Sequence, residues 1–329
     1  MTAVIPQGET LLLTGATGFV GRALWPALIA GGWQVRCLTR DIKRARDELP
    51  DRDWVEGDLA SQAAMERALK GCRAMFYLVH EMEGHSDFRR REQTDAAAVE
   101  RAAQAAGLSR IIYLGGVAPR RHASEHLRSR IEVGELLRHG AVPTIELRAS
   151  MIVGHGSMSW LIVRDLAARL PVMVLPRWLK SRTEPLAIDD AVAALVGALR
   201  VLAPASACFD IPGPQILTGQ QILEQAAAAL GRKQPRALSI PFLSPRLSSL
   251  WVRFVTRASW SVAREIVIGL TEDLLAKDAR YWQLIAHPQR KTFAEAAAQA
   301  LVQERAEGKV PGTWGVVERS LDMLHALTT

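Results

Sequence analysis

The sequence is poor in cysteine, and its histidines follow no metal-binding pattern. Three cysteines, Cys37, Cys72 and Cys208, lie far apart among 329 residues, without the short spacings of a zinc site. The eight histidines include no H-E-x-x-H pattern. An odd number of isolated thiols also argues against a disulfide framework. We therefore expect no metal centre, and a reducing compartment, the cytoplasm.

Long apolar runs are absent as well. No stretch of about 18 uncharged apolar residues occurs, so a membrane-spanning helix is not expected. No basic segment followed by an apolar core opens the chain, so secretion is not expected either. Because no nucleic-acid-binding module and no internal repeat is found, we expect a small-molecule ligand rather than nucleic acid. The sequence carries no signal for an oligomeric state.

One long segment lacks acidic residues. No Asp or Glu lies between Glu224 and Glu265, in a chain whose net charge is +7. The basic residues of this segment are Arg232, Lys233, Arg236, Arg246, Arg253, Arg257 and Arg264. One interpretation is a solvated basic face with Trp251 and Trp260 in the core. The alternative is a surface for an anionic partner: a substrate, nucleic acid, or, through 239–270, anionic lipid at the inner membrane surface.

Short apolar runs alternate with helical patterns through the first half of the chain. The runs predict six strands, at 9–16, 33–41, 54–59, 74–80, 110–117 and 143–154. The intervening patterns predict helices at 19–32, 63–72, 95–107 and 124–140. This alternation is typical of right-handed βαβ units, and therefore of a parallel sheet that is buried on both faces.

We expect an α/β fold with two parts. Residues 1–153 are predicted to form a Rossmann-type, doubly wound parallel sheet that binds a nucleotide. Residues 154–329 are predicted to form a smaller, mainly helical substrate lobe and a C-terminal helical tail, partly integrated with the first part. Such a lobe is expected over the carboxyl edge of the sheet, where ligands of this fold bind.

The stretch "TGATGFVGRAL", residues 14–24, connects the first predicted strand to the first predicted helix. Its glycines leave the backbone N–H groups uncrowded, and the helix amino end adds partial positive charge, so the turn suits a diphosphate. The candidate cofactor-binding residues of this turn are Gly15, Thr17, Gly18, Phe19, Val20 and Gly21.

The ends of the next strands supply further candidates. Arg40 ends the second strand, where an arginine can pair with the 2′-phosphate of NADP, whereas the neighbouring Asp41 keeps NAD as an alternative. Asp58, followed by Leu59, ends the third strand; its carboxylate is expected either to accept from an adenine amino group or to cap the next helix. The candidates after the fourth strand are Leu78, Val79 and His80.

The segments "TGATGFVGRAL", "GDL", "IIYLGGV" and "LRASMIVG" resemble the atypical branch of the short-chain dehydrogenase/reductase superfamily, within its extended NAD-dependent epimerase/dehydratase and NmrA-like group. The resemblance covers about residues 10–215. It implies a Rossmann fold that binds NADP(H), with a C-terminal lobe for the substrate. It also implies that Ser150, Met151 and Ile152, after the sixth strand, contact the nicotinamide through the backbone.

The tyrosine–lysine pair that performs the chemistry in typical members of this superfamily is missing. The residues four positions after Tyr77, Tyr113 and Tyr281 are Glu81, Val117 and Ile285 rather than lysine.

In register with that motif stand His126 and Arg130, while Gly115 and Gly116 occupy the usual serine position. Their spacing places His126 and Arg130 on one side of a helix, so they are catalytic candidates or merely line a cleft. His80 is a further catalytic candidate. Arg130 and Gly115 are also cofactor-binding candidates.

Two hypotheses for function follow from the resemblance. The first is an NADP-dependent oxidoreductase or epimerase-like enzyme with a small substrate; Arg177, Arg182 and His155 are its substrate-binding candidates. The second is a non-catalytic, NmrA-like protein that senses the redox state through bound NADP(H).

Overall fold

The structure, a computed structural model, describes residues 4–80, 87–119, 123–169, 172–175, 177–202, 205–232, 236–239 and 272–307, with the side chains of 172–178 and 236–239 excepted. It divides into two compact units. The first unit comprises residues 1–150, 188–212 and 275–290, and the second comprises residues 151–187, 213–274 and 291–329.

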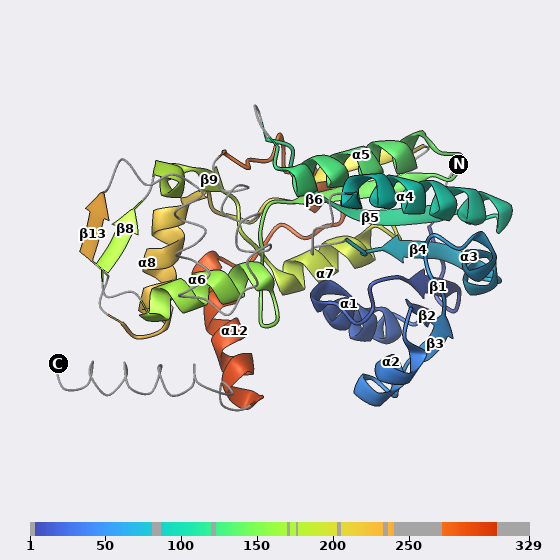
Figure 1. Cartoon of the computed structure of the whole chain (residues 1–329), viewed down its shortest axis with the longest axis horizontal. Helices are drawn as coiled ribbons and strands as arrows, with labels where there is room; N and C mark the ends of the chain where they lie inside the picture. Colours follow the sequence, from blue (N-terminus) through green and yellow to red (C-terminus); the bar gives the residue numbers. More distant parts are fainter. Residues whose placement is uncertain are drawn as a thin grey trace. The chain divides into compact units, whose positions relative to one another are not determined.

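The first unit alternates strands with helices (Figure 1). Its strands are β1 (Thr10–Leu13), β2 (Gln34–Thr39), β3 (Asp53–Glu56), β4 (Cys72–Tyr77), β5 (Arg110–Gly116), β6 (Thr144–Ala149) and β11 (Ala207–Asp210). Its helices are α1 (Phe19–Ala30), α2 (Ile42–Glu48), α3 (Gln62–Leu69), α4 (Phe88–Ala105), α5 (Glu125–His139), α7 (Ile188–Gly197) and α11 (Arg280–Leu284).

All seven strands of the first unit form one parallel sheet, in the order β11-β6-β5-β4-β1-β2-β3. The chain starts at β1 in the interior, runs outward to β3, and then crosses over to β4 on the other side of β1. This is the doubly wound Rossmann topology that the sequence predicts, and its strand order reverses between β1 and β4. Helices α3, α4 and α5 lie on one face of the sheet, and α1 and α7 lie on the other (Figure 1).

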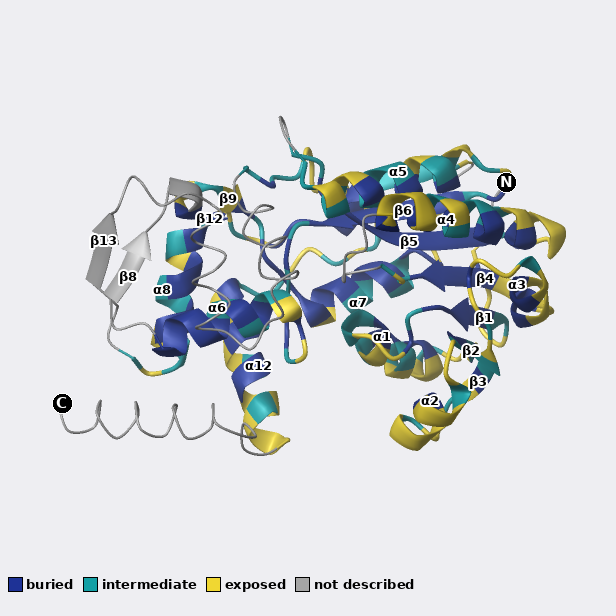
Figure 2. Ribbon diagram, in the orientation of Figure 1, coloured by how far each residue is buried: buried dark blue, intermediate teal, exposed yellow. Residues whose placement is uncertain are grey.

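Burial on both faces explains why the strands are uniformly apolar. Leu11, Leu12 and Leu13 of β1 are all fully buried, because each face of a central parallel strand packs against helices. In Figure 2 the central strands β1, β4, β5 and β6 are mostly buried, whereas the edge strand β3 and the outer sides of the helices carry exposed residues. The core of the first unit therefore sits on the two faces of the sheet.

The second half of the chain does not form one continuous lobe. Strand β11 pairs in parallel with β6, Ala207 opposite Ile145, and so adds a seventh strand to the first sheet. Helix α7 and residues 275–290 also belong to the first unit. The predicted boundary at 153 lies near the first crossing between units, at 150/151, but the chain crosses again later. A parallel strand needs a long crossover connection, which separates β11 from β6 in sequence.

The second unit combines helices with short two-stranded sheets. Its elements are β7 (Ile152–Val153), α6 (Met158–Arg169), β8 (Val172–Leu175), the 3-10 helix η1 (Arg177–Lys180), β9 (Arg182–Thr183), β10 (Leu186–Ala187), β12 (Leu217–Thr218), α8 (Gly219–Ala229), β13 (Arg236–Ser239) and α12 (Phe293–Ala306). Trp160, Ile222 and Phe293 lie in its apolar core. Of the basic segment, residues 240–270 lie outside the described residues, so the proposed lipid contact stays a prediction.

Among the helices that the structure describes, none has the length and apolar character required to cross a membrane.

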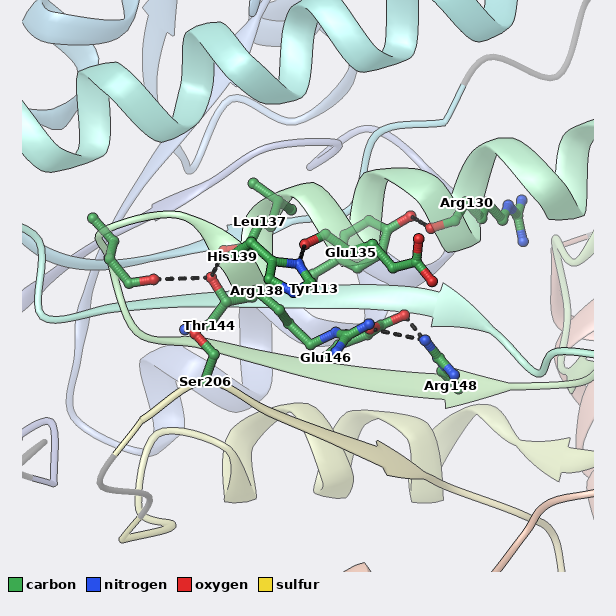
Figure 3. A network of polar contacts seen from close by, with 11 residues as sticks. Tyr113, Arg130, Glu135, Leu137, Arg138, His139, Thr144, Glu146, Arg148 and Ser206 are labelled. Atoms are coloured by element: carbon green, nitrogen blue, oxygen red, sulfur yellow. Dashed lines mark hydrogen bonds and ion pairs between the residues drawn. The ribbon is translucent and has the colours of Figure 1, made fainter.

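A buried carboxylate organises the junction of α5 with β6. Glu146 is fully buried, and its oxygens accept from Nε of Arg138 at 2.7 Å and from Nε of Arg148 at 2.8 Å (Figure 3). A buried carboxylate is tolerated only when such partners compensate for its lost hydration. Gly134 leaves the necessary room, because a Cβ there would lie 2.4 Å from Oε1 of Glu146.

This packing makes Gly134→Ala destabilising. An exposed glycine-to-alanine change inside a helix stabilises a protein by about 1 kcal/mol. At Gly134 the added methyl group would displace the Glu146 carboxylate from its arginines, so we expect a loss of about 2–3 kcal/mol of unfolding free energy. Urea denaturation measures it, with Glu135→Ala at the exposed neighbouring position as the control. An unchanged or raised stability of Gly134→Ala would contradict this account of Glu146.

Candidate cofactor site

The turn between β1 and α1 lies against the end of β4. Thr14 joins the two strands, since its hydroxyl donates to the Phe76 carbonyl at 3.0 Å and accepts from the Leu78 amide at 3.2 Å. Gly15 has φ +68°, and a Cβ there would lie 3.0 Å from the Leu78 carbonyl oxygen. Both the left-handed backbone and this close approach require glycine. The turn therefore sits at the point where the strand order reverses.

Helix α1 begins directly after this glycine turn, and its first backbone amides have no acceptor within the helix. Gly18 is the N-cap residue, without a side-chain cap, and no acidic residue occupies the first turn. A Cβ at Gly21 would lie 2.2 Å from the Gly15 carbonyl oxygen, so only glycine lets the helix pack this closely. The amides of Phe19, Val20 and Gly21 have no intrahelical acceptor, which is the arrangement that binds a diphosphate.

Arg40 directly follows β2 and carries a positive charge at the surface. It is exposed and makes no ion pair with any residue that the structure describes. The neighbouring Asp41 is occupied: its Oδ1 accepts from the Arg44 amide at 3.0 Å and thereby caps α2. Of the two groups that distinguish NADP from NAD at this position, the cation is therefore available and the carboxylate is engaged.

The residues after β3 differ in role. Asp58 is exposed, and its Oδ1 accepts from the Ala60 amide at 3.0 Å. Helix α3 is capped by Ser61 instead, whose hydroxyl accepts from the Ala64 amide at 3.3 Å. The capping alternative for Asp58 is therefore wrong, whereas its contact with adenine stays a prediction. Leu59 is buried in the core of the first unit, so its side chain supports the fold.

His80 is held as a neutral imidazole where β4 ends. Its Nε2 lies 2.9 Å from the Leu114 carbonyl oxygen, and because a carbonyl only accepts, Nε2 carries the hydrogen. Nδ1 faces Oε1 of Glu92 at 3.9 Å, and the other Glu92 oxygen accepts from the Ser129 hydroxyl. Burial, followed by the charge of Arg130, lowers the pKa of His80 to about 3. Near neutral pH this histidine therefore carries no proton that it can release as an acid.

His126 and Arg130 both lie on α5, as their spacing predicts. The ring of His126 stacks on that of Phe88, with ring centres 4.2 Å apart. The Arg130 carbonyl accepts from the Tyr113 hydroxyl at 2.9 Å, while its guanidinium is close enough to His80 to lower that pKa (Figure 3).

The three tyrosines are buried and remain protonated. Burial raises the pKa values of Tyr77, Tyr113 and Tyr281 far above the ordinary range for a phenol. The hydroxyl of Tyr281 donates to the Ala194 carbonyl at 2.7 Å, and that of Tyr113 donates to Arg130. None of them has the lowered pKa that a proton-exchanging tyrosine needs.

The glycines at the end of β5 serve packing. A Cβ at Gly115 would lie 2.9 Å from Oε1 of Glu146, and a Cβ at Gly116 would lie 2.5 Å from Cδ1 of Leu127. Glycine at the usual serine position thus makes room for a buried carboxylate and for α5. Whether Gly115 also contacts a cofactor stays a prediction.

Three further candidates, Ser150, Met151 and Ile152, lie where the chain passes from the first segment of the first unit into the second unit. Ser150 is the last residue of that segment, whereas Met151 is buried in the core of the second unit and Ile152 pairs with Leu186. Their contact with a nicotinamide stays a prediction. Val79, after β4, is 37% exposed and therefore accessible to a ligand.

The three substrate candidates belong to the second unit. His155 pairs with Glu307, Nε2 to Oε2 at 2.7 Å, and Arg182 pairs with Asp273, Nη2 to Oδ2 at 2.6 Å. Arg177 begins η1, but its side chain lies outside the described residues. Both His155 and Arg182 therefore need to exchange an internal partner before they bind a substrate.

Metal and thiol chemistry have no visible basis in the described part of the chain. No group of three or more His, Cys, Asp and Glu side chains there could hold a metal ion. Burial raises the pKa of Cys37 and that of Cys208 to about 12, so both thiols stay protonated and unreactive.

Two arginines that contact the glycine turn were not predicted from the sequence as site residues. Nε of Arg22 donates to the Thr17 carbonyl at 2.7 Å, and Nη1 of Arg52 donates to the Ala16 carbonyl at 2.8 Å. Arg22 directly follows the last glycine of the motif, which is a signal that sequence reasoning can use. Arg52 is distant in sequence, and only the fold brings it to the turn.

Known proteins resemble this chain in sequence and in fold. The NAD(P)H-binding family matches residues 15–167. The ceramide reductase of Caulobacter vibrioides is 31% identical over 241 residues, which cover 70% of this chain and 73% of that protein. The chain belongs to the atypical short-chain dehydrogenase/reductase superfamily.

Two further relatives are reductases by name. The (4-alkanoyl-5-oxo-2,5-dihydrofuran-3-yl)methyl phosphate reductase of Streptomyces griseus is 28% identical over 232 residues, covering 68% of this chain and 74% of that protein. The triphenylmethane reductase of a Citrobacter species, solved with NADP(H), superposes with a TM-score of 0.68 and 16% identity, covering 88% of this chain and 99% of that structure. This superfamily member therefore has an NAD(P)H-binding domain, and its relatives are named as reductases.

Stability at mildly acidic pH tests the neutral state of the largely buried His80. The pKa of His80 is about 3 in the folded protein and 6.5 in the unfolded chain. Below pH 6.5 the unfolded chain therefore binds a proton at this residue and the folded protein does not, so the free energy of unfolding falls as the pH is lowered. We expect this one group to cost about 2 kcal/mol between pH 7 and pH 5.

Urea denaturation at the two pH values measures this cost. The His80→Gln variant should lose about 2 kcal/mol less than the wild type over this range. His139→Gln removes an exposed ring and serves as the control. Identical losses in wild type and His80→Gln would contradict the buried, neutral state of His80.

Proposed function

We propose that the protein is an NADPH-dependent reductase of a small organic substrate. The observation that carries the cofactor assignment is the start of α1, which has no side-chain cap and follows a turn that requires glycine. Arg40, at the end of the neighbouring strand β2, pairs with none of the residues that the structure describes. The assignment as a reductase is supported by relatives that bear this name on different substrates.

Each part of the cofactor has a candidate partner in the first unit. The amides of Phe19, Val20 and Gly21 bind the diphosphate, and Arg40 pairs with the 2′-phosphate. Arg130 reaches the end of β4, where it affects His80, and there its guanidinium binds the nicotinamide ribose. Bound NADPH supplies the hydride.

A reduction also needs a proton, and exclusion among the described residues points to His126. The three tyrosines are buried with raised pKa values, and His80 is neutral and bonded to Leu114. His126, half-buried in the first turn of α5, stands where the superfamily places its tyrosine. We assign it the role of proton donor to the substrate, with its ring oriented by Phe88.

Removing the charge of Arg40 tests the cofactor preference. Because a charge-assisted hydrogen bond to phosphate contributes about 1.5–3 kcal/mol, Arg40→Met should weaken NADPH binding about 10- to 100-fold. NADH lacks the 2′-phosphate, so its affinity should not change. Calorimetric titration of both nucleotides measures the effect, with Arg46→Met on the exposed side of α2 as the matched control. Equal losses for NADH and NADPH would contradict the role of Arg40.

The proton donor is tested by turnover. With a carbonyl or quinone substrate found by screening NADPH oxidation, His126→Gln should lower kcat about 100-fold or more and flatten the dependence of kcat on pH. The dissociation constant of NADPH should stay unchanged, and His139→Gln on the same helix is the control. Full activity of His126→Gln would contradict its role. Binding of NADPH without consumption on any substrate would contradict the reductase and favour the sensor hypothesis.

A further inference from the structure

Three consecutive carbonyl groups of the glycine turn each accept a hydrogen bond from within the first unit. The Gly15 carbonyl accepts from the Gly18 amide at 3.0 Å. The Ala16 carbonyl accepts from Nη1 of Arg52 at 2.8 Å, and the Thr17 carbonyl accepts from Nε of Arg22 at 2.7 Å. Two of the three donors are thus guanidinium groups rather than backbone amides.

Neither arginine is loosely placed. Arg22 is the fourth residue of α1, and its Nη2 also pairs with Glu48 at the end of α2. Arg52 precedes β3, and its guanidinium lies over the ring of Trp25, 4.9 Å from the ring centre. Burial lowers the pKa of Arg52 from its usual value, but a guanidinium stays charged in a protein. Both therefore deliver fixed positive charge to the turn.

A diphosphate needs the amides of this turn and is repelled by its carbonyl oxygens. A backbone of alternating N–H and C=O groups offers its amides to an anion only if the carbonyls are held elsewhere. The bonds to Arg22 and Arg52 hold two of them, so the turn needs no rearrangement when the anion binds. Preorganisation of this kind strengthens binding because the ordering cost is paid on folding.

We propose that Arg22 and Arg52 are positioning residues of the cofactor site, which hold the Thr17 and Ala16 carbonyls so that the α1 amides receive the diphosphate. This inference rests on the cofactor site of the proposed function, but not on catalysis. A purely structural role for the two arginines would change the stability of the protein and leave nucleotide affinity untouched.

The test compares Arg52→Met and Arg22→Met with the wild type. Fluorescence titration gives dissociation constants for NADPH, NADH and ADP, which share the diphosphate. Because each variant loses one charge-assisted bond, we expect all three ligands to bind about tenfold more weakly. Arg40→Met, in contrast, should affect NADPH alone. Arg67→Met, at an exposed position of α3, is the matched control for the loss of one positive charge.

Thermal denaturation of the ligand-free variants separates binding from stability. If Arg52→Met fails to fold, Arg22→Met decides the matter together with Arg52→Lys, which keeps the positive charge but loses the planar guanidinium and should also weaken binding of all three ligands. Folded variants that bind the three nucleotides as the wild type does would overturn the inference, even if their melting temperatures fall. A wild-type protein that binds none of the nucleotides would instead overturn the proposed function, so the two failures are distinguishable.

Discussion

The close approach of two backbones at the centre of the sheet is the constraint on which the site depends. The turn after β1 passes so near the start of α1 that a Cβ at Gly21 would lie 2.2 Å from the Gly15 carbonyl oxygen, and Gly15 itself combines a φ of +68° with a close approach to the end of β4. This proximity brings the helix amino end, with its free amides, to the point where the strand order reverses. A larger residue at either position would separate helix from turn and lose the anion site.

Buried polar groups surround this constraint and are compensated in pairs. Glu146 sits between Arg138 and Arg148, and Glu92 accepts from Ser129 beside the neutral His80. Each carboxylate loses hydration on burial, and its hydrogen-bond partners compensate for that loss. The Glu146 contacts thereby connect α5 to β6, and the Glu92–Ser129 contact connects α4 to α5. Helix α5, which carries the catalytic candidates, is held in this way.

The site departs from the typical chemistry of its superfamily in a consistent manner. The positions of the usual tyrosine, lysine and serine hold His126, Arg130 and glycine, and the tyrosines elsewhere are buried donors. Burial raises the pKa values of the tyrosines and lowers that of His80, so neither the phenols nor this imidazole are suited to donate a proton near neutral pH. The cofactor side of the site is by comparison intact, because it depends on backbone geometry rather than on side-chain acidity.

Local sequence patterns were sufficient for most of the first unit. Strands appear within all six predicted ranges, and the glycine spacing located the turn, because both follow from short-range periodicity and steric demand. The sixth range, 143–154, was predicted as one strand but divides into β6 and β7, which belong to different sheets. Helix α4 begins earlier than predicted, at Phe88. Its first turns contain several arginines, and one of their buried positions is the charged Glu92, so the sequence there shows no apolar helical periodicity. Local periodicity cannot reveal a buried carboxylate whose partners lie on other elements.

By itself, the sequence determined the Rossmann class, the glycine turn after the first strand and the absence of the tyrosine–lysine pair, all of which are encoded by neighbouring residues. Only the tertiary structure decided that Arg52 reaches the Ala16 carbonyl, that Asp41 caps α2 while Arg40 stays open, and that β11 completes the sheet. These contacts join residues far apart in the chain or choose between adjacent groups, and packing alone makes that choice.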